Sequence, residues 1–509
     1  MLESVKVRES GADAARVTLV VVSLALGVLV AAYPLCAAAL FGAVLVLGLA
    51  TLFIVRSGLT SIPLWQALGL TALSGYMVLA YGFANLSLHV GGIPIIIGHT
   101  LMFAALGLAV VSSRRGETIG ALREPAMLVL LSLIFLTVPH LAFDIPRYGL
   151  YAVRDASLFF EGIFLLLGLL WASDPRNTEL LMKWLAILFV VNLVYSYTFP
   201  WQESLSSWSF KSGVFLVVPL LGSYNEMSLH LVLGALFCLL IGPRVLRWPA
   251  WTWTLLILAQ LAALAIHQER SMYLGLAFVL VLLPALGEVR NSVKLAAILL
   301  SGLLAVLFAT SVLGIHISGR IGPVNFAFLE SHARSLLLQP GTEEIGTIED
   351  REQWYADVWK RTQSSAANLL VGEGFGKPLI DFVVDDDQNK GVAVRQPHNT
   401  SLSVLARMGV LGLSVWLLFH FLILKRFYSV FRRRSHLEGK SYALVMFFFF
   451  FYLLSMLLTH VQPFFEFSFG AIPFYFLMGF ALGFMRWQLY LTESNGRLPQ
   501  SGFVEVHAQ

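Results

Sequence analysis

The chain has 509 residues, of which 58% are hydrophobic and only 13% are charged. A soluble core cannot bury so large an apolar fraction, so the composition excludes an ordinary soluble domain and indicates a polytopic membrane protein. The net charge of +4 says little about partners, and Cys36 and Cys238 lie in separate apolar runs, which excludes a disulfide framework or a zinc ribbon.

Hydropathy along the chain predicts fourteen membrane-spanning helices, because a bilayer core requires about 20 apolar residues in helical form. The first predicted span is short, and the sixth contains Glu161. We therefore expect an all-α polytopic membrane protein with spans near 17–32, 35–55, 64–83, 93–112, 126–143, 155–172, 180–199, 222–242, 251–267, 271–287, 293–315, 400–424, 441–459 and 466–486.

Lysine and arginine residues predict the orientation of these spans. Most of them fall in loops on one side, and the strongest cluster runs from Lys425 to Lys440. Cytoplasmic loops are enriched in these residues, so both termini are expected in the cytoplasm. The short loops of the opposite side contain only Arg147, Arg154, Lys211 and Arg270.

The predicted spans divide the chain into four regions. Residues 1–315 form about 11 spans, 316–397 a large extracytoplasmic loop with short helices, 398–487 about three spans, and 488–509 a cytoplasmic tail. Within the loop, Thr347 is expected to cap a helix with Trp354, Val358 and Arg361 on one face. Three glycines at 372, 374 and 376 then predict a turn, and the acidic segment 383–391 is expected to be solvated surface.

Polar residues gather toward the outer half of the predicted bundle. Charges inside a membrane are costly and mark functional sites by default, although snorkelling and interfacial anchoring explain many single cases. The inner half offers little beyond Lys183 and His420. The set suggests a polar cavity open to the outside, and its members are His99, His140, Asp144, Arg147, Arg154, Asp155, Glu161, Glu226, Arg270, His398, Arg407 and Glu466.

Two of these residues have candidate chemical roles. Arg270 lies in a very short turn, and its planar fork suits phosphate oxygens, but a salt bridge to Glu269 or another acid is an equal alternative. His398 follows Pro397 at the start of a helix that Asn399 or Thr400 can cap. The helix dipole should keep the imidazole neutral, as a general base requires, although such a histidine is often structural.

Several motifs between about Gly222 and Trp416 resemble the bacterial O-antigen ligase and polymerase superfamily. The Ser-Arg-Gly turn of that family corresponds to Arg270, with Glu269 and Ser271 replacing its neighbours, and its asparagine-rich stretch corresponds imperfectly to the region of Asn225. The other matching positions are Arg351, Trp354, Gly372, Gly374, Gly376, His398, Asn399, Leu402, Leu405, Gly409 and Gly412.

The resemblance implies a metal-independent, inverting glycosyltransferase at the outer face of a bacterial inner membrane. It implies a polyprenyl-diphosphate-linked glycan donor, a glycan or lipid-glycan acceptor, no cofactor and no nucleic-acid partner. Membrane lipids and other polysaccharide assembly proteins are further expected partners. His398 and Arg270 would be catalytic, and the residues expected to bind substrate are Arg351, Asn399, Arg154, Trp354 and Gly374.

The alternative is a transporter whose polar rim lines a substrate path. A transporter should have polar residues through both leaflets and broken helices in matching halves. The inner half of this chain is largely apolar, which favours the transferase. The motifs do not separate ligases, which move glycan onto a lipid, from polymerases, which extend the glycan.

Overall fold

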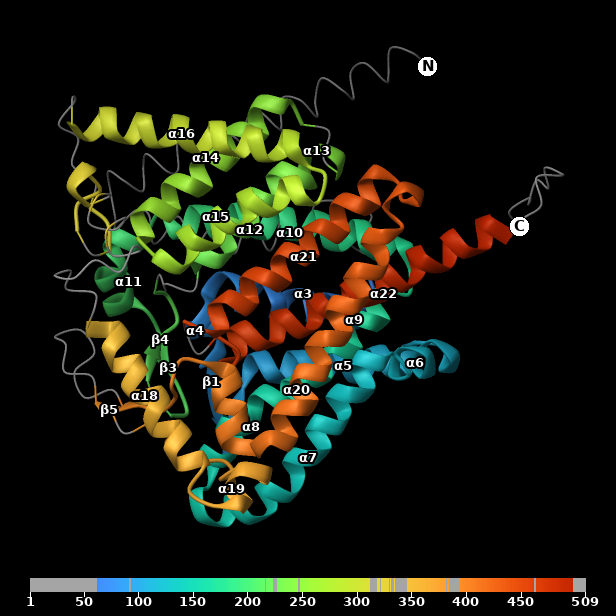
Figure 1. The fold of residues 1–509 in the computed structure, drawn as a ribbon, viewed down its shortest axis with the longest axis vertical. Coiled ribbons are helices and arrows are strands. Elements are labelled where there is room, and N and C mark those ends of the chain that lie inside the picture. The colour runs from blue at the N-terminus through green and yellow to red at the C-terminus, as the bar shows by residue number, and fades with distance from the viewer. Residues whose placement is uncertain are drawn as a thin grey trace.

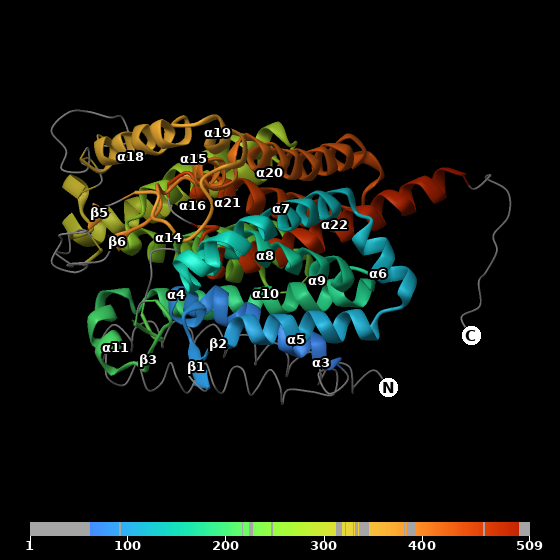
Figure 2. The ribbon, with the colours of Figure 1, turned by 90° about the horizontal axis from the view of Figure 1, so that it is seen from below.

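The fold was described from a computed structural model that covers residues 62–90, 93–215, 217–222, 227–245, 248–311, 318–320, 322–328, 330, 334, 346–380, 382–383, 393–461 and 464–497. These residues form a mostly helical bundle (Figures 1 and 2). The predicted spans at 17–32 and 35–55, together with Asn225, Glu226 and most of the acidic segment, lie outside the described residues.

The first half of the described chain contains helices broken by short connections. Two antiparallel strand pairs, with strands of four and of two residues, lie among these described elements. The elements are α3 (Leu64–Ser74), η2 (Gly75–Leu79), α4 (Ala80–Ala84), β1 (Ser87–Val90), β2 (Ile93–Ile96), α5 (Ile97–Ser112), α6 (Arg115–Leu122), α7 (Pro125–Tyr148), α8 (Leu150–Phe160), η3 (Glu161–Ile163), α9 (Phe164–Trp171), α10 (Pro175–Ser196), η4 (Phe199–Trp201), α11 (Gln202–Trp208), β3 (Lys211–Ser212) and β4 (Val218–Pro219).

The second half contains the longest helices and the segments of the predicted outer loop. Its elements are α12 (Met227–Leu240), α13 (Gly242–Val245), α14 (Ala250–His267), α15 (Arg270–Ala285), α16 (Val289–Ser311), α18 (Gly346–Thr362), α19 (Ala366–Val371), β5 (Phe382–Val383), β6 (Ala393–Val394), α20 (Thr400–Arg432), η6 (Arg434–His436), α21 (Gly439–Thr459) and α22 (Ser468–Arg497).

Eight of the described helical segments are long and apolar enough to cross a membrane, and α5, α12 and α15 contribute shorter apolar helices. The chain is therefore a multi-pass membrane protein, while the total of fourteen spans stays a prediction. The helix of the outer loop begins at Gly346, one residue before the cap expected at Thr347. The expected span 155–172 is interrupted, because η3 begins at Glu161 between α8 and α9.

The all-α prediction needs one correction, because three small antiparallel pairs are present: β1 with β2, β3 with β4, and β5 with β6. In each pair, the backbone amide and carbonyl groups of the two strands form hydrogen bonds to each other outside the helices. Ser212 links the first two pairs, since its hydroxyl accepts a hydrogen bond from the Ser87 amide at 3.0 Å.

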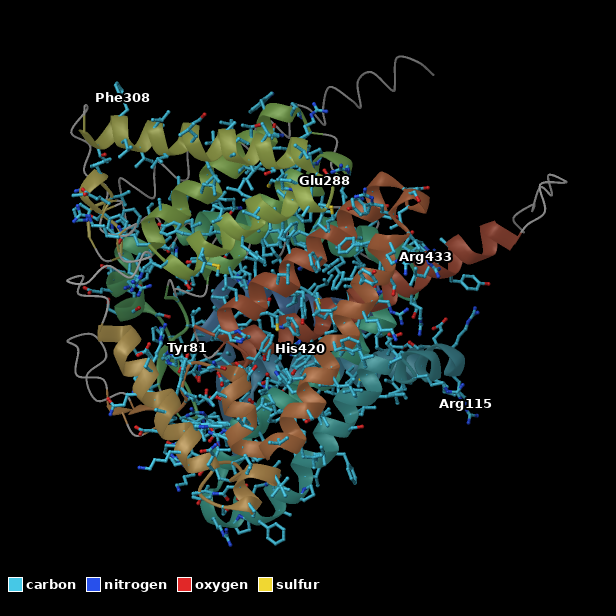
Figure 3. All side chains as sticks on the ribbon, viewed as in Figure 1. Tyr81, Arg115, Glu288, Phe308, His420 and Arg433 are labelled. Atoms are coloured by element: carbon cyan, nitrogen blue, oxygen red, sulfur yellow. The ribbon has the colours of Figure 1, made fainter. Side chains whose placement is uncertain are left out.

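The bundle has two distinct ends. One end, at the left of Figure 1, holds α4, α11, α18 and the β-pairs, and we call it the α18 end. The other, at the right, holds α6 and the turns after α15 and α20, and we call it the α6 end. Figure 3 shows Tyr81 at the first end, Arg115, Glu288 and Arg433 at the second, and His420 between them.

Helix α22 runs through the centre of the bundle, and almost its whole apolar window is buried. Aromatic side chains of α21 and α22 fill the middle of the molecule, with Phe447, Phe448, Phe450, Phe474 and Phe480 each at most 1% exposed. Large buried aromatics of this kind contribute strongly to helix packing. They form an apolar layer between the two ends.

Candidate functional site

The glycine motif forms the predicted turn. Gly372, Gly374 and Gly376 all have positive φ angles, of 84°, 82° and 93°. Side chains rarely adopt this backbone region, whereas glycine adopts it without steric cost. The turn therefore requires glycine at alternate positions, and it reverses the chain after α19.

Two buried carboxylates hold this turn. Asp144 accepts a hydrogen bond from the Phe375 amide at 2.7 Å, and Asp155 accepts one from the Gly376 amide at 3.1 Å. The two acids are 6% and 4% exposed. The expectation that they line an outward-open cavity is therefore wrong, because both serve to anchor the turn.

Helix α20 is kinked where the turn meets it. Gly409 has φ 64° and ψ −168°, which breaks the helical pattern inside the 33-residue helix. In a regular helix the carbonyls of Ala406 and Arg407 would accept hydrogen bonds from residues four positions later. Here they accept from the amides of Glu373 and Gly374, at 2.9 and 3.1 Å. The kink thus lets the glycine turn bond to the side of a membrane helix.

A second contact fixes α18 against the same turn. The Arg361 guanidinium donates to both oxygens of Glu373, at 2.8 and 2.7 Å, and to the carbonyls of Pro378 and Leu379. Val358 is buried on the same face, and Trp354 packs beside it. The predicted face of this helix is confirmed, and the described part of the outer loop is built onto the start of α20.

His398 lies at the start of α20 in a strained conformation. Its φ of 52° is left-handed, which is uncommon for a residue with a side chain. Asn399 caps the helix through a hydrogen bond from the Leu402 amide at 3.1 Å. The ring of Trp354 stands edge-on to the imidazole, with centroids 5.7 Å apart. Strain held by surrounding structure is typical of functional positions.

Arg351 is electrostatically coupled to His398 on one side and to Arg270 on the other. Burial, and after it the charge of Arg351, lower the pKa of His398 to about 4. Burial also lowers the pKa of Arg351; Tyr355 opposes that shift and the charge of Arg270 adds to it. The imidazole is neutral near pH 7 as predicted, although burial and a neighbouring cation are the causes here. The couplings relate three segments that are far apart in sequence, and a single cavity lined by all three residues stays a prediction.

The turn between α14 and α15 positions Arg270. Gln268 ends α14 with a left-handed φ of 53°. Its side-chain amide donates to the Gly322 carbonyl at 2.8 Å and accepts from the Gly322 amide at 3.2 Å. Glu269 is buried and accepts a hydrogen bond from the Ser271 hydroxyl at 2.7 Å. These hydrogen bonds attach the turn to the backbone at Gly322. They should hold Arg270 at a fixed depth relative to the membrane.

A groove of about 520 Å³ runs between α18 and α20 beside this cluster. Leu402, Leu405 and Leu413 form its floor on α20, and Tyr355 and Trp359 line the side of α18. Asn399 lies at one end, next to His398 in the chain. The groove thus extends along the apolar flank of a membrane helix and begins at the candidate site.

The remaining predicted residues lie apart from this cluster. Arg154 pairs with Asp155 at 3.7 Å and lies over the rings of Tyr151 and Phe215. Gly374 has its amide and its carbonyl bonded to Arg407. Its backbone is therefore part of the scaffold of the turn, and a role of either residue in substrate binding stays a prediction.

A separate polar cluster lies deeper in the bundle. His99 bonds to Glu161 at 2.9 Å, and the Ser468 hydroxyl donates to the same carboxylate oxygen at 2.5 Å. Tyr76 lies 3.4 Å from the other ring nitrogen of His99. Glu161 is only 2% exposed, so these bonds stabilise a buried acid where the helix between α8 and α9 is interrupted.

The sequence alone did not identify the partners that build the site. Asp144 and Asp155 are 231 and 221 residues from the amides that they bind, and no local pattern marks such pairs.

A comparison with protein-family models, and another with curated proteins, find no match to this chain. The resemblance therefore depends on the motifs themselves and stays a prediction.

Proposed function

We propose that this chain is a membrane glycosyltransferase of the O-antigen ligase and polymerase type. It takes a glycan from a polyprenyl diphosphate donor at the outer face of a bacterial inner membrane. The observation that supports this best is the electrostatic coupling of Arg351 to both Arg270 and His398. Two arginines beside a neutral imidazole suit a phosphate group and a hydroxyl that loses its proton.

The proposed reaction is a single displacement at the anomeric carbon. The oxygen of an acceptor hydroxyl forms the new bond to that carbon from the face opposite the diphosphate. The bond to the diphosphate oxygen breaks, and its electron pair leaves with the diphosphate. Arg270 and Arg351 stabilise the charge that grows on this leaving group, and His398 takes the hydroxyl proton.

A diphosphate bound between Arg270 and Arg351 would offset the charge of Arg351 and raise the pKa of the imidazole, because a nearby negative charge favours the protonated form. The base would then become stronger when the donor is in place. The imidazole would also bind the leaving group more tightly once it has accepted the proton.

The apolar groove between α18 and α20 gives the donor lipid a place. Leucine side chains of α20 line the groove. Asn399, which precedes this helix and follows the candidate catalytic residue His398, lines it as well. A chain of isoprene units is wholly apolar and gains free energy when apolar side chains cover it. The arrangement therefore suits a donor whose lipid lies in the groove and whose diphosphate lies at His398.

The buried phenylalanines in the middle of the bundle favour a transferase over a transporter. Phe447, Phe474 and Phe480 are each at most 1% exposed and make much of the interior around α21 and α22 apolar. A transport path needs polar groups through both leaflets. A transferase needs access from one side only.

A gene deletion tests the proposal in cells. Surface glycans from the deletion strain are separated on a gel, and the strain is complemented with wild type, His398→Ala or His89→Ala. His89 is an exposed histidine on β1 and is the matched control. Loss of long chains with intact single repeats supports a polymerase, and accumulation of lipid-linked polymer supports a ligase. Unchanged glycans, or rescue by His398→Ala, would overturn the proposal, and lost uptake of a solute would favour the transporter.

A further inference from the structure

The inward face of the first turns of α20 is polar. Thr400, Ser403 and Arg407 lie three and four residues apart, which places them on one side of the helix. They are 1%, 2% and 2% exposed. Arg407 pairs with Asp155 at 2.9 Å, and the hydroxyl of Thr400 has no hydrogen-bond partner among the described residues. The Ser403 hydroxyl faces Glu466 and acts on that carboxylate as a hydrogen-bond donor. Buried hydroxyls without partners cost free energy and are rare.

Glu466 faces the same region from the segment before α22. It is 8% exposed, and its carboxylate oxygens form no well-aligned hydrogen bond within the described part of the chain, although the Ser403 hydroxyl is close enough to lower its pKa as a donor. Burial raises its pKa to about 7, whereas Ser403 and Arg407 on α20 favour its ionised form and Asp155 on α8 opposes it. A carboxylate with Ser403 as its neighbouring donor can accept further hydrogen bonds from a ligand.

We propose that Glu466, Ser403 and Thr400 form a buried subsite that binds the hydroxyls of a sugar ring. This inference rests on the proposed glycosyltransferase function and extends it. A carboxylate accepts two hydroxyl donors, and serine or threonine hydroxyls both donate and accept, so the three match adjacent hydroxyls of a sugar. Thr400 is two residues from His398, which places the subsite next to the proposed base.

The other face of the same helix suits a different part of the donor, its lipid chain. Leu402 and Leu405 alternate with the polar residues and line the apolar groove. The start of α20 therefore has a side that suits a lipid chain and a side that suits a sugar, with His398 at the junction. The three polar residues bind and orient the sugar, and they form no bond to the reacting atoms.

The test is Glu466→Gln in the full chain, reconstituted in lipid nanodiscs. The probes are lipid-linked glycan extracted from the source membranes and the acceptor glycan from the same strain. Glutamine keeps the size but loses the charge, so the KM for one of the two glycans should rise at least about tenfold, with a smaller change in kcat. Glu203→Gln, at an exposed position of α11, is the matched control and should leave KM unchanged.

The pH dependence gives a second readout. An ionised carboxylate accepts hydroxyl bonds, and a protonated one loses half of that capacity. The affected KM should therefore rise as the pH falls through about 7 in wild type, and should be flat over this range in Glu466→Gln. Ser403→Ala should raise the same KM by a smaller factor without removing the pH dependence.

The outcomes separate this inference from the proposed function. If His398→Ala is inactive while Glu466→Gln and Ser403→Ala keep wild-type KM values, the groups hold bound water only and the subsite is wrong. A lowered melting temperature with unchanged KM would likewise assign Glu466 a purely structural role. If His398→Ala is fully active, the proposed function itself fails.

Discussion

At the scale of single residues, His398 combines an uncommon backbone conformation with a neutral side chain. Its φ is 52°, and burial and Arg351 lower its pKa to about 4. For a residue with a Cβ, this left-handed conformation raises the free energy of the folded state by roughly 1–2 kcal/mol. The chain therefore maintains a strained residue at the point where α18, the loop and α20 meet.

Replacing His398 should separate chemistry from stability. His398→Gly and His398→Ala both remove the imidazole, so both should abolish glycan transfer. Glycine adopts a positive φ without strain, so His398→Gly should be more stable than His398→Ala by about 1 kcal/mol. Product analysis on gels and thermal melting of the purified variants check the two effects. Transfer at the wild-type rate by either variant would contradict the general-base role.

Arg270→Lys tests whether the arginine provides geometry or only charge. Lysine keeps the charge but loses the planar fork that matches two phosphate oxygens. Transfer should fall at least about tenfold, since a hydrogen bond to a charged group contributes roughly 1.5–3 kcal/mol. Arg115→Lys, at an exposed position of α6, is the control. Full activity of Arg270→Lys would point to simple pairing with an acid such as Glu269.

At the scale of elements, the kink of α20 is the feature on which the site is built. The φ of 64° and ψ of −168° at Gly409 belong almost exclusively to glycine. A Cβ at Gly409 would also overlap the Leu370 carbonyl at the end of α19. The kink frees two carbonyls that hold the glycine turn. It therefore connects the outer loop to the membrane helix that begins at His398.

Gly409→Ala should destabilise the protein and impair transfer together. Strain and overlap should lower the free energy of unfolding by at least about 1–3 kcal/mol, measured by thermal melting in detergent. Gly107→Ala is the control, since a Cβ there meets nothing within 4 Å and alanine favours a helix. If both variants melt at the wild-type temperature, the kink does not constrain the turn.

The hydropathy pattern predicted the helices well but missed their interruptions. Most predicted spans within the described residues coincide with a helix or a broken helix, because the apolar content of a span is a local property of the sequence. The span predicted at 93–112 begins instead with strand β2, and its helix α5 starts at Ile97. The break at Glu161 and the kink at Gly409 depend instead on what packs against them. The three positive-φ glycines were predictable because their requirement is local.

The candidate site was only partly predictable for the same reason. His398, Asn399 and the face of α18 follow from local motifs. The anchoring of the turn by Asp144 and Asp155, and the polar groups around Glu466, arise from contacts between distant segments. No periodicity or spacing in one sequence encodes such contacts, so these acids were recognisable only as unusual charges near the membrane.

At the scale of the whole molecule, the charges differ between the two ends. Arg114, Arg115 and Arg123 lie around α6, and Arg432 and Arg433 lie at the end of α20, all at the α6 end (Figure 1). Cytoplasmic loops are enriched in lysine and arginine. The α6 end is therefore expected in the cytoplasm, which would leave the candidate site on the outer side, as the proposed reaction requires.

Cysteine labelling tests this orientation. Lys360→Cys, exposed on α18, and Arg115→Cys, exposed on α6, are introduced separately into a chain in which Cys36 and Cys238 are replaced by serine. A membrane-impermeant maleimide should label Lys360→Cys in intact cells with a permeabilised outer membrane, and should label Arg115→Cys only after the inner membrane is disrupted. The cysteine-free chain controls for background, and retained glycan transfer shows that the variants fold. The opposite labelling pattern would place His398 in the cytoplasm, where a donor exposed only on the outer face could not reach it, and the proposed reaction would then have no substrate on its side of the membrane.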